Sequence, residues 1–532
     1  MKSIFALLAA GLLITGCGPS AHNKVSKEKN NAPADPVVYA ETITADEIKD
    51  MLYVYASDEF EGRETGEPGQ KKAVEYLKAQ YQSMEIPSPL KGDDYFQEVP
   101  LQKRQVAKTT ITINDRNFAP FDHQFCLLGG TTQTITASDV VYAGYGVESE
   151  GYSDYKDLDV KDKVVLIKAG EAKNEDGTYV TTGTAEPTKW SGGRQSMFSK
   201  RNLARDKGAR AILLMDEAIF PRYATYYSTI YNSSTSYASQ GGRMSLKDNG
   251  KNAPFFLVDS VFAKVIYDKI VNDHTPKSIT ANLTIDIENS SKDFTSENVV
   301  AFIEGSEKPD EIVVISAHLD HVGVDENKEV FNGADDDGSG TVAVVEIAEA
   351  FKEAQKNGHG PKRSILFLHV TGEEKGLLGS KYYTDMDPIF PLENTVANLN
   401  IDMIGRVDPK RKTGDRNYVY LIGSDKLSTE LHNISEDVNL KYCNVELDYK
   451  YNDENDPNRF YYRSDHYNFA KNNIPVIFYF NGTHDDYHKI TDTPDKIEYD
   501  LLENRARLVF HTAWELANRD ERIVVDKAEA SE

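Results

Sequence analysis

The stretch EIVVISAHLDHVGVDENKEVFNGADDDGSG, residues 311–340, decides how the rest of the chain is interpreted. Its apolar run, Ile312 to Ile315, consists of Ile and Val alone and is bounded by polar residues, which is typical of a central strand in a parallel sheet. His318 and Asp320 follow that run, and in open α/β sheets ligands bind beyond the carboxyl ends of the strands. Because an imidazole and several carboxylates are costly to bury together without a cation, the stretch predicts half of a metal site.

Length and charge limit the class of protein. The chain has 532 residues, 39% of them hydrophobic, which favours two or three units with sizeable cores. A formal net charge of −25 argues against nucleic acid as a partner, since phosphates require a basic face. Cys126 and Cys443 lie far apart in the sequence, so whether they pair is left open.

The N-terminus predicts export. Met1-Lys2-Ser3 precedes a short apolar run, residues 4–14, which is too short to remain as a membrane-spanning helix. The run Ile14-Thr15-Gly16-Cys17 resembles a bacterial lipobox, in which the cysteine becomes the lipidated first residue. We therefore expect a membrane-anchored lipoprotein of a bacterial cell envelope, on the periplasmic side or the cell surface. The alternative is an ordinary signal peptide with an incidental cysteine.

Two kinds of pattern divide the remaining chain. Short strand-like runs such as Lys163 to Ile167 and Phe255 to Val258, with a few helices between them, indicate a β-rich unit inserted into the chain. The order of a tyrosine- and glycine-rich strand, KDKVVLI, a helix and KGARAILL resembles the protease-associated domain. Outside this insertion, strands alternate with helices to about Asn518, which predicts an α/β fold with a mixed, mostly parallel sheet covered by helices on both faces.

Polar clusters follow four of the expected strands. They are His318 and Asp320 with Asp336, the pair Glu373 and Glu374, Asp402, and the run from His484 to His488. Each cluster is weak evidence alone, but their shared position at strand ends makes the set stronger. Histidine nitrogen and carboxylate oxygen without a thiolate suit zinc or a similar divalent ion at a catalytic site, and a bridging carboxylate would allow two ions.

Five motifs occur in an order that points to one family. They are SAHLDHVG, GADDDGSG, TGEEKGLLGS, NIDMIGR and YHKITDTPDKI, beginning at residues 316, 333, 371, 400 and 487. This set resembles the co-catalytic zinc exopeptidases, a family that includes bacterial leucyl-type aminopeptidases, glutaminyl cyclases and glutamate carboxypeptidases.

The resemblance implies a role for each matching residue. It implies two zinc ions held by five side chains: His318 and Asp402 on one ion, Glu374 and His488 on the other, and Asp336 bridging both. Glu373 would be the general base in two-zinc activation of water, and Asp320 would hydrogen-bond His318. Tyr487 would donate to the oxyanion, and Arg463 falls where related enzymes have an arginine near the product backbone.

The expected activity is that of a zinc-dependent metallo-aminopeptidase acting on peptides with a free N-terminus. The expected organisation is a lipoprotein signal peptide at 1–17, a tether at 18–43, a peptidase domain at 44–118 and 276–519, a protease-associated insertion at 119–275, and a tail at 520–532.

Three alternatives remain: a glutaminyl cyclase with a single zinc, a carboxypeptidase of the same fold, and a non-catalytic surface-binding lipoprotein. A carboxypeptidase acting on acidic peptides would need a basic pocket, which a sequence does not show. The chain has no GxSxG, HExxH, P-loop or GxGxxG motif, which argues against serine hydrolases, zincins and nucleotide enzymes.

Overall fold

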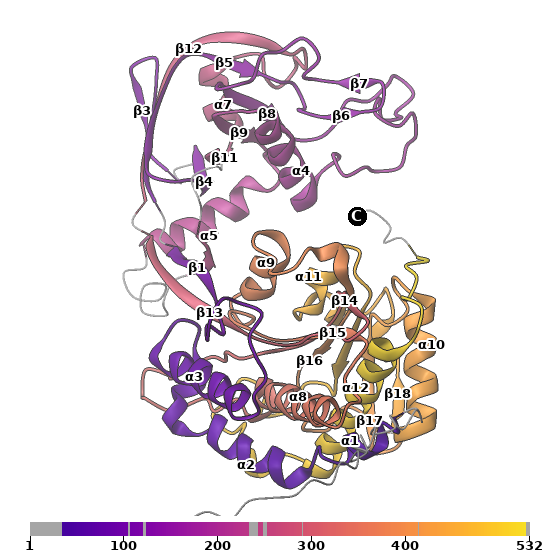
Figure 1. Cartoon of the computed structure of the whole chain (residues 1–532). Helices are drawn as coiled ribbons and strands as arrows, with labels where there is room; N and C mark the ends of the chain where they lie inside the picture. The colour runs from indigo at the N-terminus through magenta and orange to yellow at the C-terminus, as the bar shows by residue number, and fades with distance from the viewer. Residues whose placement is uncertain are drawn as a thin grey trace, which may run out of the picture. The chain divides into compact units, whose positions relative to one another are not determined.

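The computed structural model describes residues 34–104, 107–120, 124–232, 243–247, 253–289, 291–412 and 414–527, and Figure 1 shows its trace. The predicted signal peptide 1–17 with Cys17, most of the tether 18–43 and the end of the tail lie outside these residues. From Pro36 onward the chain forms one unit. Within the described part of the chain, no helix combines the length and the apolar character needed to cross a membrane.

A nine-stranded mixed sheet forms the larger layer. In spatial order its strands are β10 (Arg243–Leu246), β1 (Phe96–Arg104), β13 (Lys292–Ile303), β15 (Arg363–Val370), β14 (Lys308–His318), β16 (Thr395–Ile401), β19 (Val476–Phe480), β17 (Tyr418–Ile422) and β18 (Glu446–Asp448). The strands from β15 to β19 run parallel, while β13 and β17 pair with this centre in the antiparallel sense. The prediction of a mixed α/β sheet is confirmed, with parallel pairing concentrated at its centre.

The central strands are buried on both faces, which explains their high content of apolar residues. Every residue of β15, β16 and β19 is buried, and so is β14 from Ile312 to His318. The polar side chains that these strands do contain are paired: Asn398 donates to Ser316, and Ser316 donates to Asn400. The parallel direction of β14, β15, β16 and β19 also brings their carboxyl ends to one edge of the sheet.

Helices cover both faces of this sheet, as the sequence predicts (Figure 1). One face carries α1 (Val37–Ala40), α2 (Ala45–Tyr55), α3 (Pro68–Ser83), α8 (Gly340–Lys356) and α12 (Tyr499–Asn518), and the other carries α9 (Leu378–Asp385) and α11 (His466–Ala470). Helix α10 (Thr429–Val438) packs against α12. Helix α8 is buried along most of its length because it contacts both β14 and α12.

A second sheet of eight strands is formed by the region between β1 and β13. Its strands in spatial order are β3 (Arg116–Phe118), β2 (Lys108–Ile113), β12 (Lys277–Glu288), β5 (Gln133–Tyr142), β8 (Val164–Lys168), β9 (Ala211–Met215), β11 (Phe255–Val258) and β4 (Phe125–Gly129). It is accompanied by α4 (Gly193–Asp206), α5 (Phe220–Asn232), α7 (Ser260–Ile266) and the small hairpin of β6 (Glu148–Ser149) and β7 (Tyr152–Ser153).

The limits of this second layer differ from the range 119–275 that the sequence predicts for an insertion. Strands β2 and β12 pair with each other outside that range and belong to the second sheet. Strand β10, in contrast, lies inside that range but pairs with β1 of the larger sheet, Leu246 opposite Leu101. The assignment of this region to the protease-associated domain stays a prediction.

Candidate metal centre

The first side chain of the site, His318, is the last residue of β14 and is only 1% exposed. Its Nδ1 lies 3.0 Å from the backbone carbonyl oxygen of Asp320, so this nitrogen carries the proton and donates it. Its Nε2 is thereby left with a lone pair, 3.2 Å from Asp336 Oδ1 and 3.8 Å from Asp402 Oδ1. Three predicted ligands therefore meet at the end of the central strands.

The orientation of His318 corrects one sequence-based prediction. The backbone of Asp320 holds the imidazole, while its carboxylate Oδ1 is 3.9 Å from Nδ1. That carboxylate instead accepts hydrogen bonds from the Thr65 hydroxyl, at 2.6 Å, and from the backbone N–H of Glu373, at 3.1 Å. The Asp320 carboxylate therefore positions the loop that carries Glu373.

The three consecutive aspartates have different surroundings. Asp337 accepts hydrogen bonds from the backbone N–H groups of His318, Gly340 and Met403, at 3.0–3.1 Å, and so ties together the ends of β14 and β16 and the start of α8. Asp335 accepts from the Gly405 N–H at 2.6 Å and faces His484 at 3.2 Å. A carboxylate oxygen of Asp337 lies close enough to His318 and Asp402 to share a metal ion with them. Both oxygens of Asp337, however, already accept hydrogen bonds from backbone N–H groups.

Asp336 is the aspartate whose carboxylate faces the histidines on two sides. Its Oδ1 is 3.2 Å from His318 Nε2, and its Oδ2 is 3.0 Å from His488 Nε2. This placement is what a bridging carboxylate requires, and it agrees with the choice of Asp336 within the triplet.

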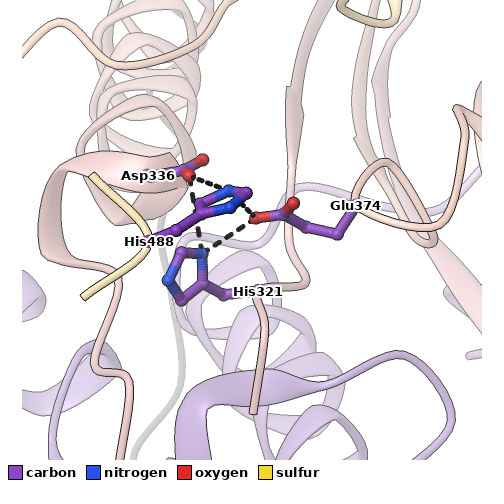
Figure 2. A group of neighbouring side chains, drawn as sticks. All are labelled: His321, Asp336, Glu374 and His488. Carbon is purple, nitrogen blue, oxygen red and sulfur yellow. Dashed lines mark ion pairs between the residues drawn. The ribbon is translucent and has the colours of Figure 1, made fainter. Parts of the chain in front are cut away.

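A second group of donors surrounds the other oxygen of Asp336 (Figure 2). His321, Asp336, Glu374 and His488 each offer one ligand atom, and these atoms lie within 4.8 Å of one another. Glu374 Oε1 is 3.0 Å from His321 Nδ1 and 3.1 Å from His488 Nε2. Figure 2 shows the two imidazoles and the two carboxylates converging from separate segments.

His321 is a member of this group that sequence reasoning missed. It is fully buried, and neither of its ring nitrogens has a hydrogen-bond partner among the described residues. The available signal was its position three residues after His318, in the loop where the strand-end ligands were expected.

The cavity beside the metal centre contains three further residues that the sequence singled out: Glu373, Tyr487 and Arg463. They line this small cavity of about 30 Å³ with Asp336, Asp402, Thr483 and the apolar side chains of Met403, Phe460, Phe478 and Phe480. The ring of Tyr487 stacks on that of His488, with centroids 3.9 Å apart. Asp402 is fixed by a 2.7 Å hydrogen bond from the Ser464 hydroxyl.

The electrostatics of the site favour a bound cation. Burial and the neighbouring charges of Glu374 and Asp402 raise the pKa of Glu373 well above its ordinary value. Burial alone would raise the pKa of Asp336, but the neighbouring imidazoles of His318 and His488 hold it well below its ordinary value. Burial would lower the pKa of His488, yet Asp336 and Glu374 raise it to about 10. The negative charge of the carboxylates therefore exceeds the positive charge that the histidines supply, and the site stabilises a bound cation.

The donor set itself fits divalent metal ions. Buried atoms without a hydrogen bond among the described residues include His318 Nε2, both ring nitrogens of His321, Asp336 Oδ2, Glu374 Oε1 and His488 Nε2. Leaving so many polar atoms unsatisfied is costly unless something binds them. Imidazole nitrogens and carboxylate oxygens are ligands that zinc accepts.

Fold and site together define a class: α/β proteins with a buried cluster of histidines and carboxylates for divalent cations at the carboxyl ends of parallel strands. Residues 298–513, which include every residue of this cluster, match peptidase family M28. For this part of the chain, the match confirms the resemblance to zinc exopeptidases that the sequence motifs indicate.

Curated relatives match parts of the chain. It is 30% identical over 228 residues to leucine aminopeptidase 1 of Penicillium rubens, an alignment that covers 41% of this chain and 56% of the relative. It is 36% identical over 106 residues to a probable glutamate carboxypeptidase of Arabidopsis thaliana, covering 20% of this chain and 14% of the relative. The chain thus spans about half or less of the length of these two relatives.

Solved structures give a weaker likeness. An aminopeptidase from Aneurinibacillus sp. strain AM-1 is 18% identical, with 93% of this chain and 99% of that chain covered and a TM-score of 0.44.

Proposed function

We propose that this protein is a zinc-dependent metallo-aminopeptidase that removes N-terminal residues from peptides. The observation that carries the proposal is the convergence of His318, Asp336, Glu374, Asp402 and His488 within one buried site beside Glu373. The match of residues 298–513 to peptidase family M28 and the likeness to a protein named leucine aminopeptidase support the choice of reaction.

Two zinc ions would be held on the two sides of Asp336. His318 and Asp402 would bind one ion, and Glu374 and His488 the other, with His321 as a further donor to the second ion. The chemistry that zinc supplies when bound in such a site is polarisation of the scissile carbonyl and activation of a water molecule.

Glu373 would act as the general base. It lies in the same small cavity as Asp336 and Asp402, and its backbone N–H is anchored on the Asp320 carboxylate. From there it would accept a proton from the attacking water and deliver it to the leaving amine. Tyr487, in the same cavity, would donate a hydrogen bond to the oxyanion. Arg463 would contact the product backbone.

The carboxylate-rich cavity also accounts for exopeptidase selectivity. A free N-terminal ammonium group is attracted to Glu373 and Asp402, whereas an acylated N-terminus has no charge to offer. Phe460, Phe478 and Phe480 would offer apolar contact to the first residue of the substrate.

Purified protein assayed on aminoacyl-nitroanilides and on N-acetylated peptides, with metal content measured on the same sample, tests the proposal. We expect hydrolysis of free-amine substrates alone and two zinc ions per chain. Cyclisation of N-terminal glutamine with one zinc would show a glutaminyl cyclase instead. Equal cleavage of N-blocked peptides would exclude an aminopeptidase.

Export and lipid anchoring through Cys17 remain a separate proposal, supported by the sequence Ile14-Thr15-Gly16-Cys17. Cells expressing the protein with and without globomycin, which blocks lipoprotein processing, test it. Recovery of the mature protein without lipid on Cys17 would refute the anchor.

A further inference from the structure

A second cavity, of about 930 Å³, lies next to the turn that carries the metal ligand Glu374. This volume is within the range of roughly 300–1,000 Å³ typical of ligand sites. Its walls come from α4, α5, the edge strand β10 and the segment that leads into α9. We call it the basic cavity.

The charge of its lining is opposite to that of the chain. Seven basic side chains line it, and none of its described lining residues is acidic, although acidic residues outnumber basic ones 85 to 60 in the sequence. Four are arginines of the two helices: Arg194, Arg201, Arg205 and Arg222. The other three are Lys247, Lys375 and Lys381.

Three of these cations are paired with carboxylates, Arg205 with Asp206, Lys247 with Asp293 and Lys375 with Glu64, at 2.6–2.9 Å. Others lack an acidic partner. The Arg201 guanidinium lies 4.7 Å from the centroid of the Phe198 ring and donates to the Asn202 side chain. Arg194 also lies over Phe198, at 5.5 Å. Within the described residues, no carboxylate is within ion-pair distance of Arg194 or Arg222, and both are exposed. Their charges are therefore available to a ligand.

The basic cavity and the metal centre share one turn of backbone. The carbonyl oxygen of Glu373 accepts hydrogen bonds from the N–H groups of Gly376 and Leu377, at 2.8 and 3.0 Å. Glu373 and Glu374 face the metal centre from this turn, while Lys375 and Gly376 line the basic cavity. This turn therefore borders both the metal centre and the basic cavity.

We propose that the basic cavity binds acidic side chains of the peptide substrate on the C-terminal side of the scissile bond. The inference rests on the proposed peptidase function, because it assigns the cavity to the part of the substrate that leaves the catalytic site. Arginines match carboxylates in geometry as well as charge, and the aromatic side chains of Tyr223, Tyr226 and Phe255 offer apolar contact to the peptide chain. The enzyme then prefers acidic peptides over neutral ones of equal length.

Binding of an uncleavable peptide tests the cavity apart from catalysis. The probe is an N-acetylated hexapeptide with four consecutive glutamates, labelled at its C-terminus, and the comparison peptide has four glutamines. On zinc-loaded protein we expect the glutamate peptide to bind at least about tenfold more tightly, and less so at high salt. The double variant Arg194→Gln/Arg222→Gln should lose most of this preference.

Arg210→Gln provides the matched control. Arg210 is an exposed arginine that follows α4 and does not line the cavity, so the variant removes one charge from the same region. It should keep the preference for the glutamate peptide. An equal loss in this variant would show a general charge effect and overturn the proposal, and so would equal binding of the two peptides by the unmodified protein.

Steady-state kinetics test whether the basic cavity affects the cleavage of peptides. The ratio of kcat/KM for Leu-Ala-Glu₄ over Leu-Ala-Gln₄ should fall about tenfold or more in the double variant, while hydrolysis of leucine nitroanilide stays unchanged. An unchanged ratio would overturn the proposal. If no peptide is cleaved by any form of the protein, the peptidase function fails, and the binding comparison still decides whether the cavity selects carboxylates. Inorganic phosphate that binds this cavity where the glutamate peptide does not would also overturn it.

Discussion

At the residue scale, the metal centre depends on which atom of each side chain is already occupied. His318 uses Nδ1 to contact a backbone carbonyl and leaves Nε2 for the site, whereas Asp337 uses both carboxylate oxygens on backbone N–H groups. His321 has neither nitrogen occupied by a partner among the described residues. These differences separate the proposed ligands from the residues that support them more sharply than residue type does.

Replacement of Glu373 by Gln tests the general base. The variant keeps the size of the side chain but cannot accept a proton, so kcat should fall by roughly 10²–10⁴-fold. Zinc content should stay at the unmodified level, because Glu373 is not proposed as a ligand. Steady-state kinetics and elemental analysis of one preparation measure both quantities; near-normal kcat would remove Glu373 from this role.

Replacement of His321 by Ala tests the residue that sequence reasoning missed. Loss of a nitrogen 3.0 Å from the Glu374 carboxylate should weaken binding of one zinc ion by about 10–100-fold. Titration with a zinc chelator measures this. His484→Ala is the control, because its ring faces Asp335 at 3.2 Å rather than the group around Glu374. Equal zinc affinity in both variants and the unmodified protein would contradict a ligand role for His321.

Most of the site could be predicted at this scale because its residues stand at strand ends within distinctive motifs. His318, Asp336, Glu374, Asp402 and His488 meet in the structure as the motifs suggest. The roles of Asp320 and His321 could not be predicted from the sequence motifs. Whether a carboxylate or a backbone carbonyl holds an imidazole depends on loop conformation, which residue spacing does not specify.

At the scale of elements, α8 combines a favourable apolar surface with one unfavourable group. Glu346 is 2% exposed, and its Oε2 has no hydrogen-bond partner among the described residues. Burial, with a further contribution from Glu47 and Glu349, raises its pKa from 4.5 to about 8. The folded protein therefore retains a proton on this carboxyl group that the unfolded chain has already released near pH 7.

This shift predicts a pH-dependent loss of stability. Below about pH 4.5 both states are protonated and the group costs nothing; as pH rises from there to about 8, the unfolded state is favoured increasingly. Glu346→Gln should remove this penalty and raise the free energy of unfolding at pH 8 by roughly 1–3 kcal/mol, with little change near pH 5.

Denaturant unfolding at the two pH values measures the difference. Glu75→Gln in α3 is the control, because that side chain is 65% exposed and its replacement removes the same charge. A gain of equal size at pH 5 and pH 8 would contradict the assignment to Glu346 ionisation.

Elements that are buried on both faces were the easiest to predict. Strands β14, β15, β16 and β19 are rich in apolar residues and are central strands, because their side chains are buried on both faces of the sheet. Strand β10 has only four residues and no such run, and its membership in the larger sheet depends on pairing with β1 far away in sequence. The limits of the second sheet depend on long-range pairing of β2 with β12 for the same reason.

At the scale of the whole molecule, zinc should contribute to global stability. The metal centre joins segments that stretch from residue 318 to residue 488, and without a cation its carboxylates lie close together in a buried site. Zinc that binds the folded state alone, at about 100 times its Kd, would add about 2.7 kcal/mol.

Thermal unfolding with and without a chelator measures this contribution. We expect a lower Tm after zinc removal and recovery on adding zinc back. Asp336→Asn, which weakens both ion sites, should show a much smaller response to the chelator. Complete zinc removal with no change in Tm would contradict the structural contribution.

Strand β10 also has a consequence for solubility. It is the edge strand of the larger sheet, and it satisfies the backbone groups of β1 from Leu101 to Arg104. A shortened protein without the region between β1 and β13 would expose this row of unpaired donors and acceptors, which is a template for pairing with another chain. In the intact chain β10 covers this edge of β1, and an engineered shortened chain would need a new edge strand in its place.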